Sequence, residues 1–222
     1  MRSLRYPFIA MFVVFISATN AFAACDEVVI PSWAMPTDAT FQYQHAERLW
    51  SGDDCYIQDF SRSAELYQLS AEKGYAPAQT DIGTFHEKGF LRNEDKVEAV
   101  RWYRLAAVQG YARGQARLAG MYRFGIGVLQ DYQEAVRWYR LAAEQGNTTG
   151  QFGLGYMHRA GQGVLQDKVW AHMWFNIASA NGDTYAATQR DELALTMASE
   201  EIIMAQSLAR KCLSSNYQQC GY

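Results

Sequence analysis

The chain has 222 residues, of which 49% are hydrophobic and 19% are charged, and its formal net charge is −3. These values are typical of a soluble globular chain that is long enough for one domain or one repeat array. The slight acidic excess argues against the basic face of a nucleic-acid-binding protein, so we expect no nucleic-acid partner.

Residues 1–23 have the pattern of a secretory signal peptide. Arg2 and Arg5 precede an apolar stretch from Phe8 to Ile16, and Ala21-Phe22-Ala23 supplies a cleavage site of the small-x-small type. The apolar stretch is too short to span a bilayer as a helix, and no second long apolar run follows it. We therefore expect a mature protein without an integral membrane span, exported to the periplasm of a Gram-negative envelope or secreted.

The sequence contains four cysteines, which are Cys25, Cys55, Cys212 and Cys220. An even number in an exported chain favours disulfides, and four cysteines allow three pairings. We favour Cys25 with Cys55 and Cys212 with Cys220, so that each bridge staples one end of the chain. The alternative is a lipid anchor on Cys25, because Phe22-Ala-Ala-Cys25 resembles a bacterial lipoprotein box with phenylalanine where leucine is usual. That anchor would leave one cysteine unpaired.

The central part of the chain repeats with a period of 36 residues. After an irregular lead-in at residues 24–39, the phrases Asp95–Gly110 and Asp131–Gly146 are nearly identical, and looser copies run from Asp59 to Gly74 and from Asp167 to Gly182. A fixed period of this size is the signature of a solenoid. We expect an array over residues 40–182, with about three full repeats and a degenerate first one whose helix spans Thr40 to Trp50.

Two helices are expected in each repeat. The first, helix A, covers about 76–88, 113–124 and 149–160 and ends at a glycine that can adopt the left-handed cap. The second, helix B, begins at the periodic aspartate, a good N-cap, and Glu98 and Glu134 fit a capping box. A small residue inside each helix A is expected to let a neighbour approach closely, since an interior glycine otherwise costs up to ~1 kcal/mol. These residues are Gly83, Ala119 and Gly155.

After Gly182 the pattern changes. Two helices at about 185–197 and 199–213 are expected within residues 183–213, and their charged residues suit the polar outer face that ends a repeat array. Residues 214–222 form a polar tail. One helix pair cannot bury its apolar face alone, so the predicted fold is an all-α solenoid in which stacked pairs supply the core.

The repeat resembles the Sel1-like repeat family, which is related to the tetratricopeptide repeats. The resemblance is carried by Leu154 to Gly182 and by Gln130 to Gly146, with Ala-x-x-Trp-Tyr-x-x-Ala-Ala-x-Gln-Gly at 135–146, and it covers most of residues 59–210. It implies a right-handed α/α superhelix of Sel1-like helix pairs. It also implies a scaffold for protein–protein contacts, often in the bacterial envelope.

No recognisable catalytic or metal-binding constellation accompanies the repeat. The sequence has no Gly-x-Ser-x-Gly motif. Its four histidines have neither His-x-x-x-His spacing nor a mixed Cys/His cluster, and we interpret His86 and His158 as one packed repeat position. We expect no catalytic residue, metal or cofactor. The family includes cysteine-rich proteins described as penicillin-binding or weak β-lactamases, with a cysteine pair in every repeat, whereas here only Cys212 and Cys220 have comparable spacing. A penicillin-recognising protein and a cell-wall glycan-binding protein remain the alternatives.

The favoured function is therefore a non-catalytic scaffold that binds a protein or peptide partner. In stacked helix pairs of this kind helix A lines the concave side, and positions that vary between repeats would recognise the partner. Arginine and aromatic residues are enriched among interface anchors. The candidates are Arg117, Arg123, Phe124, Phe152, Tyr156 and Arg159. The alternative for Phe124 and Phe152 is packing against the next repeat.

Overall fold

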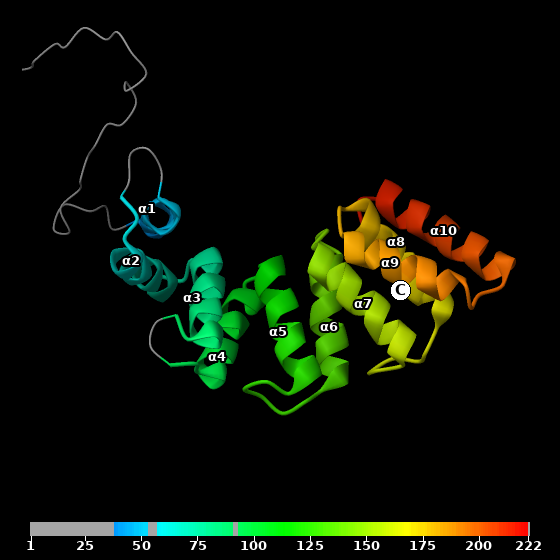
Figure 1. Ribbon diagram of the computed structural model, residues 1–222, viewed down its shortest axis with the longest axis horizontal. Coiled ribbons are helices and arrows are strands. Elements are labelled where there is room, and N and C mark those ends of the chain that lie inside the picture. Colours follow the sequence, from blue (N-terminus) through cyan, green and yellow to red (C-terminus); the bar gives the residue numbers. More distant parts are fainter. Residues whose placement is uncertain (1–37, 53–56, 91–92, 222) are drawn as a thin grey trace, which may run out of the picture.

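The computed structural model describes residues 38–52, 57–90 and 93–221, and this part of the chain contains ten helices and no strand (Figure 1). The first eight helices form four pairs. These are α1 (Ala39–Ser51) with α2 (Phe60–Glu72), α3 (Ala76–Lys88) with α4 (Lys96–Val108), α5 (Ala112–Phe124) with α6 (Tyr132–Ala143), and α7 (Thr148–Ala160) with α8 (Lys168–Ala180). Helices α9 (Thr184–Ala194) and α10 (Ser199–Ser214) follow. The predicted all-α solenoid is confirmed, whereas the predicted signal peptide, Cys25 and Cys55 lie outside the described residues.

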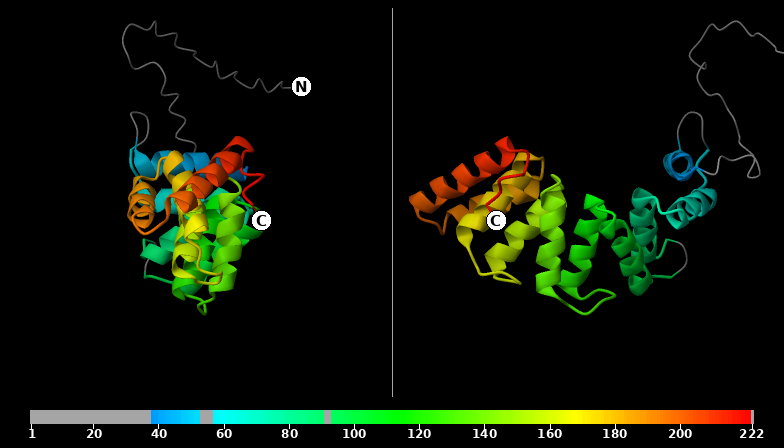
Figure 2. Two further views of the ribbon diagram at one scale, coloured as in Figure 1. Left: turned by 90° about the vertical axis from the view of Figure 1, so that its right-hand side faces the viewer. Right: turned by 180° about the vertical axis from the view of Figure 1, so that it is seen from behind.

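The helix pairs follow one another along an arc (Figures 1 and 2). Helix α3 packs against α5, and α5 packs against α7, so the first helices of successive pairs contact one another directly. The second helices contact mainly the first helices on either side of them. The first helices are therefore the more closely spaced row, which puts them on the inner, concave side of the curve.

The periodic aspartates are N-caps of the second helices. The side chain of Asp95 accepts a hydrogen bond from the amide of Glu98 at 2.9 Å, and Asp59, Asp131 and Asp167 cap their helices in the same way. Of the capping box predicted for Asp95 and Glu98, only the bond to the aspartate side chain forms. The Glu98 carboxylate binds Arg101 at 2.6 Å instead of returning to the cap, because a guanidinium three residues along offers a charge-assisted bond.

The glycines inside the first helices lie where a ring from the second helix presses against the backbone. A Cβ built on Gly155 would lie 2.6 Å from the ring of Phe175, and one on Gly83 would lie 2.7 Å from the ring of Tyr103. Real Cβ atoms do not approach so closely, so the predicted packing reason for these glycines is confirmed.

A buried glutamine near the start of each first helix joins successive repeats. The side chain of Gln115 donates to the carbonyl of Ala107 at 3.3 Å and accepts from the side chain of Gln145 at 2.8 Å. The same pair of bonds recurs around Gln79 and around Gln151. Each glutamine thereby adds a second donor to a carbonyl at the end of the preceding helix, which also accepts from a backbone amide of the following turn.

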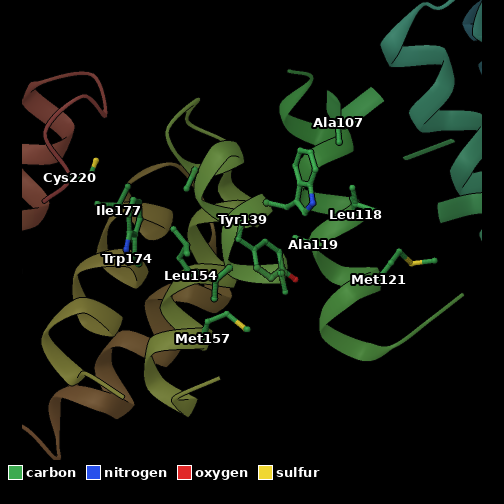
Figure 3. Close-up of a cluster of buried hydrophobic side chains, with 14 of the residues drawn as sticks. Ala107, Leu118, Ala119, Met121, Tyr139, Leu154, Met157, Trp174, Ile177 and Cys220 are labelled. Atoms are coloured by element: carbon green, nitrogen blue, oxygen red, sulfur yellow. The ribbon is translucent and has the colours of Figure 1, made fainter. Parts of the chain in front are cut away.

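The C-terminal helix caps the array by folding back onto α8. Helix α10 contacts α8, and its buried Ala205, Ala209 and Cys212 belong to the same apolar cluster as Trp174 and Ile177 (Figure 3). The outer face of α8 is correspondingly apolar. Its Trp170, Met173 and Ile177 stand where α6 has Glu134, Arg137 and Leu141. Because apolar residues replace charged ones on this face of α8, it is the helix that α10 covers.

The tail after α10 returns to the same face. Cys212 and Cys220 lie close together, with Cα atoms 4.4 Å apart, which is within the range of disulfide-bonded pairs. Tyr217 rests on Gly146, and its hydroxyl exchanges hydrogen bonds with Asn181. Within the described residues, no helix has the length and apolarity needed to cross a membrane.

Candidate partner-binding groove

A groove of about 510 Å³ opens on the row of first helices. It lies mainly on α5, between the end of α3 and the start of α7, and the ring of Tyr139 from α6 reaches it from behind. Gly120 faces the Tyr139 hydroxyl, and a Cβ there would lie 3.7 Å from it, an ordinary van der Waals distance. The polar and aromatic lining residues are Glu87, Arg113, Arg117, Phe124, Tyr139, Asn147 and Thr149.

The end of the groove nearest α3 is acidic, and its charges are paired. Asp81 binds Arg113 at 2.6 Å and accepts a hydrogen bond from the Tyr43 hydroxyl at 3.0 Å. Glu87 accepts a hydrogen bond from the Tyr103 hydroxyl at 2.6 Å. Burial, and then this bond to Glu87, raise the pKa of Tyr103, so its hydroxyl remains a donor.

Basic and aromatic side chains lie beside the groove, between α5 and α7. The guanidinium of Arg123 lies 3.6 Å from the ring centre of Tyr156 and 4.6 Å from that of Phe124. Burial raises the pKa of Tyr139, and the positive charge of Arg123 opposes that rise. Arg123 is thus in contact with two aromatic rings.

The structure brings together four of the six predicted site residues. Arg117 and Phe124 line the groove, and Phe124 is 59% exposed. Arg123 lies beside the groove, against the rings of Phe124 and Tyr156. The ring of Phe152 packs 5.6 Å from Phe175 and 5.5 Å from Tyr185, so this residue follows the packing alternative.

Arg159 is directed towards the next helix instead of the groove. Its guanidinium donates a hydrogen bond to the side chain of Gln189 on α9. The repeat position that it shares with Arg123 therefore has a different partner at the C-terminal end of the array.

Sequence reasoning missed the acidic half of the groove and its floor. Glu87 occupies the repeat position of Arg123 and Arg159, so the change of charge at this position was visible in the sequence. Tyr139 is almost fully buried, and it nevertheless lines the groove between α5 and α7.

Across residues 38–52, 57–90 and 93–221, no group of three or more His, Cys, Asp or Glu side chains is placed to hold a metal ion. His158 is buried, with its ring 6.0 Å from that of Trp170, and burial lowers its pKa.

Comparison with known proteins places the array in a family. The family described as "Sel1 repeat" matches residues 39–75, 76–111, 112–147 and 148–183. No curated protein matches the chain.

Two solved structures share the architecture. One is a protective antigen of uropathogenic Escherichia coli strains that displays an SLR fold (TM-score 0.73, 29% identity, covering 82% of this chain and 40% of that one). The other is a Sel1 repeat protein from Oxalobacter formigenes (TM-score 0.60, 31% identity, covering 67% of this chain and 43% of that one). The chain thus spans about two fifths of the length of either structure. Four matched repeats make it a repeat scaffold of a type that commonly mediates protein interactions, and the chain belongs to the Sel1 repeat family.

Proposed function

We propose that this chain is an exported, non-catalytic scaffold that binds a protein or peptide partner in the concave groove on α3, α5 and α7. The observation that carries the proposal is the groove itself. Its lining combines an exposed aromatic side chain, Phe124, with Arg117, and Arg123 lies beside it against the Phe124 ring. These residue types are the usual anchors of protein interfaces.

The proposed location is the periplasm or the exterior of the cell. Its support is the leader-like sequence of residues 1–23 and the presence of four cysteines in an even count. N-terminal sequencing of protein recovered from the periplasmic and culture fractions tests it. We expect a free chain that starts directly after Ala23, whereas an uncleaved chain in the cytoplasm would contradict export, and a diacylated Cys25 would replace free export by a lipid anchor.

Binding in the groove is tested by capture from the host's envelope fraction. The bait is the mature chain, beside a groove variant (Arg117→Ala with Arg123→Ala) and an outer-face variant (Arg101→Ala with Arg137→Ala). Both variants remove two partly exposed arginines and change the net charge equally. The outer-face variant also breaks two surface ion pairs, Arg101 with Glu98 and Arg137 with Glu134.

We expect a partner that the unaltered chain and the outer-face variant retain and the groove variant loses. A partner lost only by the outer-face variant, or retained by both, would refute the groove as the binding surface. Recovery of no protein, together with retention of the chain on isolated cell wall, would favour glycan binding instead.

A further inference from the structure

The groove residues also indicate which kind of segment would bind there. We propose that the bound segment is an acidic peptide, whose carboxylates pair with Arg117 and Arg123 while an apolar side chain beside them contacts Phe124. This inference rests on the proposed function, since it specifies the partner of the same groove.

The first step is the charge that the fold leaves without a close counter-ion. Arg113 has a carboxylate oxygen at 2.6 Å, from Asp81. Arg117 has one only at 4.0 Å, from Glu87, whose carboxylate already accepts from Tyr103. For Arg123 no carboxylate lies within 4.0 Å among the described residues, and it contacts the rings of Phe124 and Tyr156. Positive charge is therefore in excess on the α5–α7 side, where Arg117 lines the groove and Arg123 lies beside it against Phe124.

The second step is the fixed position of Arg123. The guanidinium lies over the Tyr156 ring, and a contact of this kind leaves the N–H edge for an acceptor. The contacts with Tyr156 and Phe124 reduce the side-chain freedom that binding would otherwise remove. Carboxylates match this edge in two parallel hydrogen bonds, so a preorganised arginine favours an acidic partner.

The third step is the apolar surface beside the two arginines. Phe124 lies one residue from Arg123, lines the groove and is 59% exposed. Beyond its contact with Arg123 the ring is largely in water, and burying it against an apolar group of the bound segment would be favourable. A segment with a carboxylate followed closely by an aromatic or aliphatic residue would satisfy both features. A basic segment would instead meet like charges at α5.

The test is selection from a displayed library of random 12-residue peptides against the immobilised mature chain. Selection is repeated on Arg117→Glu with Arg123→Glu, and on the matched outer-face variant Arg101→Glu with Arg137→Glu. Thermal unfolding of each variant verifies that it is folded before it is used. The readout is the frequency of Asp and Glu, and of Lys and Arg, in the enriched peptides.

We expect the unaltered chain and the outer-face variant to enrich peptides with Asp or Glu next to an apolar residue. The groove variant should instead enrich Lys and Arg. Binding of a selected peptide should weaken by roughly tenfold in Arg123→Gln, and it should weaken further when salt is raised.

Four results would count against the inference. Enriched peptides without acidic residues would overturn the acidic segment and leave the groove as a binding surface. Acidic peptides that the groove variant binds equally well would overturn the inference and place their binding outside the groove. Failure to enrich any peptide would overturn both this inference and peptide binding in the groove. Selected peptides displaced at low concentration by a sequence-unrelated polyanion, such as heparin, would assign the arginines to anionic polymers instead.

Discussion

The packing of α7 against α8 predicts that Gly155 cannot be enlarged without loss of stability. A Cβ at this position would lie 2.6 Å and 2.7 Å from two atoms of the Phe175 ring, which is fully buried and has no free space to enter. Overpacking of this kind costs about 1–3 kcal/mol. Alanine recovers up to ~1 kcal/mol of helix propensity relative to glycine. The net effect of Gly155→Ala is therefore a loss of about 1–2 kcal/mol in the free energy of unfolding.

The matched control is Gly120→Ala on α5. A Cβ there meets only the Tyr139 hydroxyl, at 3.7 Å, which is an ordinary van der Waals contact. This substitution should leave the free energy of unfolding unchanged or raise it by up to ~1 kcal/mol. Urea titrations followed by circular dichroism give both values, and the melting temperature of Gly155→Ala should fall by about 3–6 °C. Equal stabilities of the two variants would refute the packing argument.

Three further predictions concern stability. Burial is the main cause that lowers the pKa of His158 and His172 in the folded chain. The unfolded chain therefore takes up protons at a higher pH, and the free energy of unfolding should fall as the pH drops below ~6.5. Equal urea midpoints at pH 8 and pH 5.5 would contradict this. Cys212 and Cys220 should form a disulfide, seen as a loss of 2 Da in the non-reduced mass of the C-terminal peptide, because one bridge removes two hydrogens. Its loss in Cys212→Ser should cost about 2.5 kcal/mol in denaturant unfolding, from the eight-residue separation. Asp131→Ala should cost about 1 kcal/mol and Asp131→Asn much less, since only alanine removes the acceptor of two amides; equal melting temperatures would contradict the cap.

The helix pattern was predictable because each helix carries its own signals. The predicted first helices at 76–88, 113–124 and 149–160 agree with α3, α5 and α7 within one residue. The aspartate caps and terminal glycines act within a single turn, so the linear sequence is sufficient to locate them.

Contacts between repeats were less predictable. The glutamine bonds around Gln115 and the fold-back of α10 onto α8 depend on how helices distant in sequence are placed. The sequence did carry a signal for the fold-back of α10, since Trp170 and Met173 replace the charged residues of the preceding repeats. The pairing of Asp81 with Arg113, 32 residues apart, had no comparable signal.

The candidate site was predictable in residue type but only partly in position. Arg117, Arg123, Phe124 and Tyr156 were found because they vary between repeats on the first helices. Phe152 shares that property and nevertheless packs against the next helix pair, because α8 and α9 bring Phe175 and Tyr185 beside it. Whether a variable aromatic side chain is exposed depends on these neighbours.

The most direct test of groove binding is site-specific photocrosslinking in the living host. A photoreactive phenylalanine analogue replaces Phe124 in the groove or, as the control, Leu105 on the outer row, which are 59% and 38% exposed. We expect one defined crosslinked product from position 124 and none from position 105, and that product should disappear in Arg117→Ala with Arg123→Ala. A product from position 105 alone, or equal products from both positions, would contradict a partner bound in the concave groove.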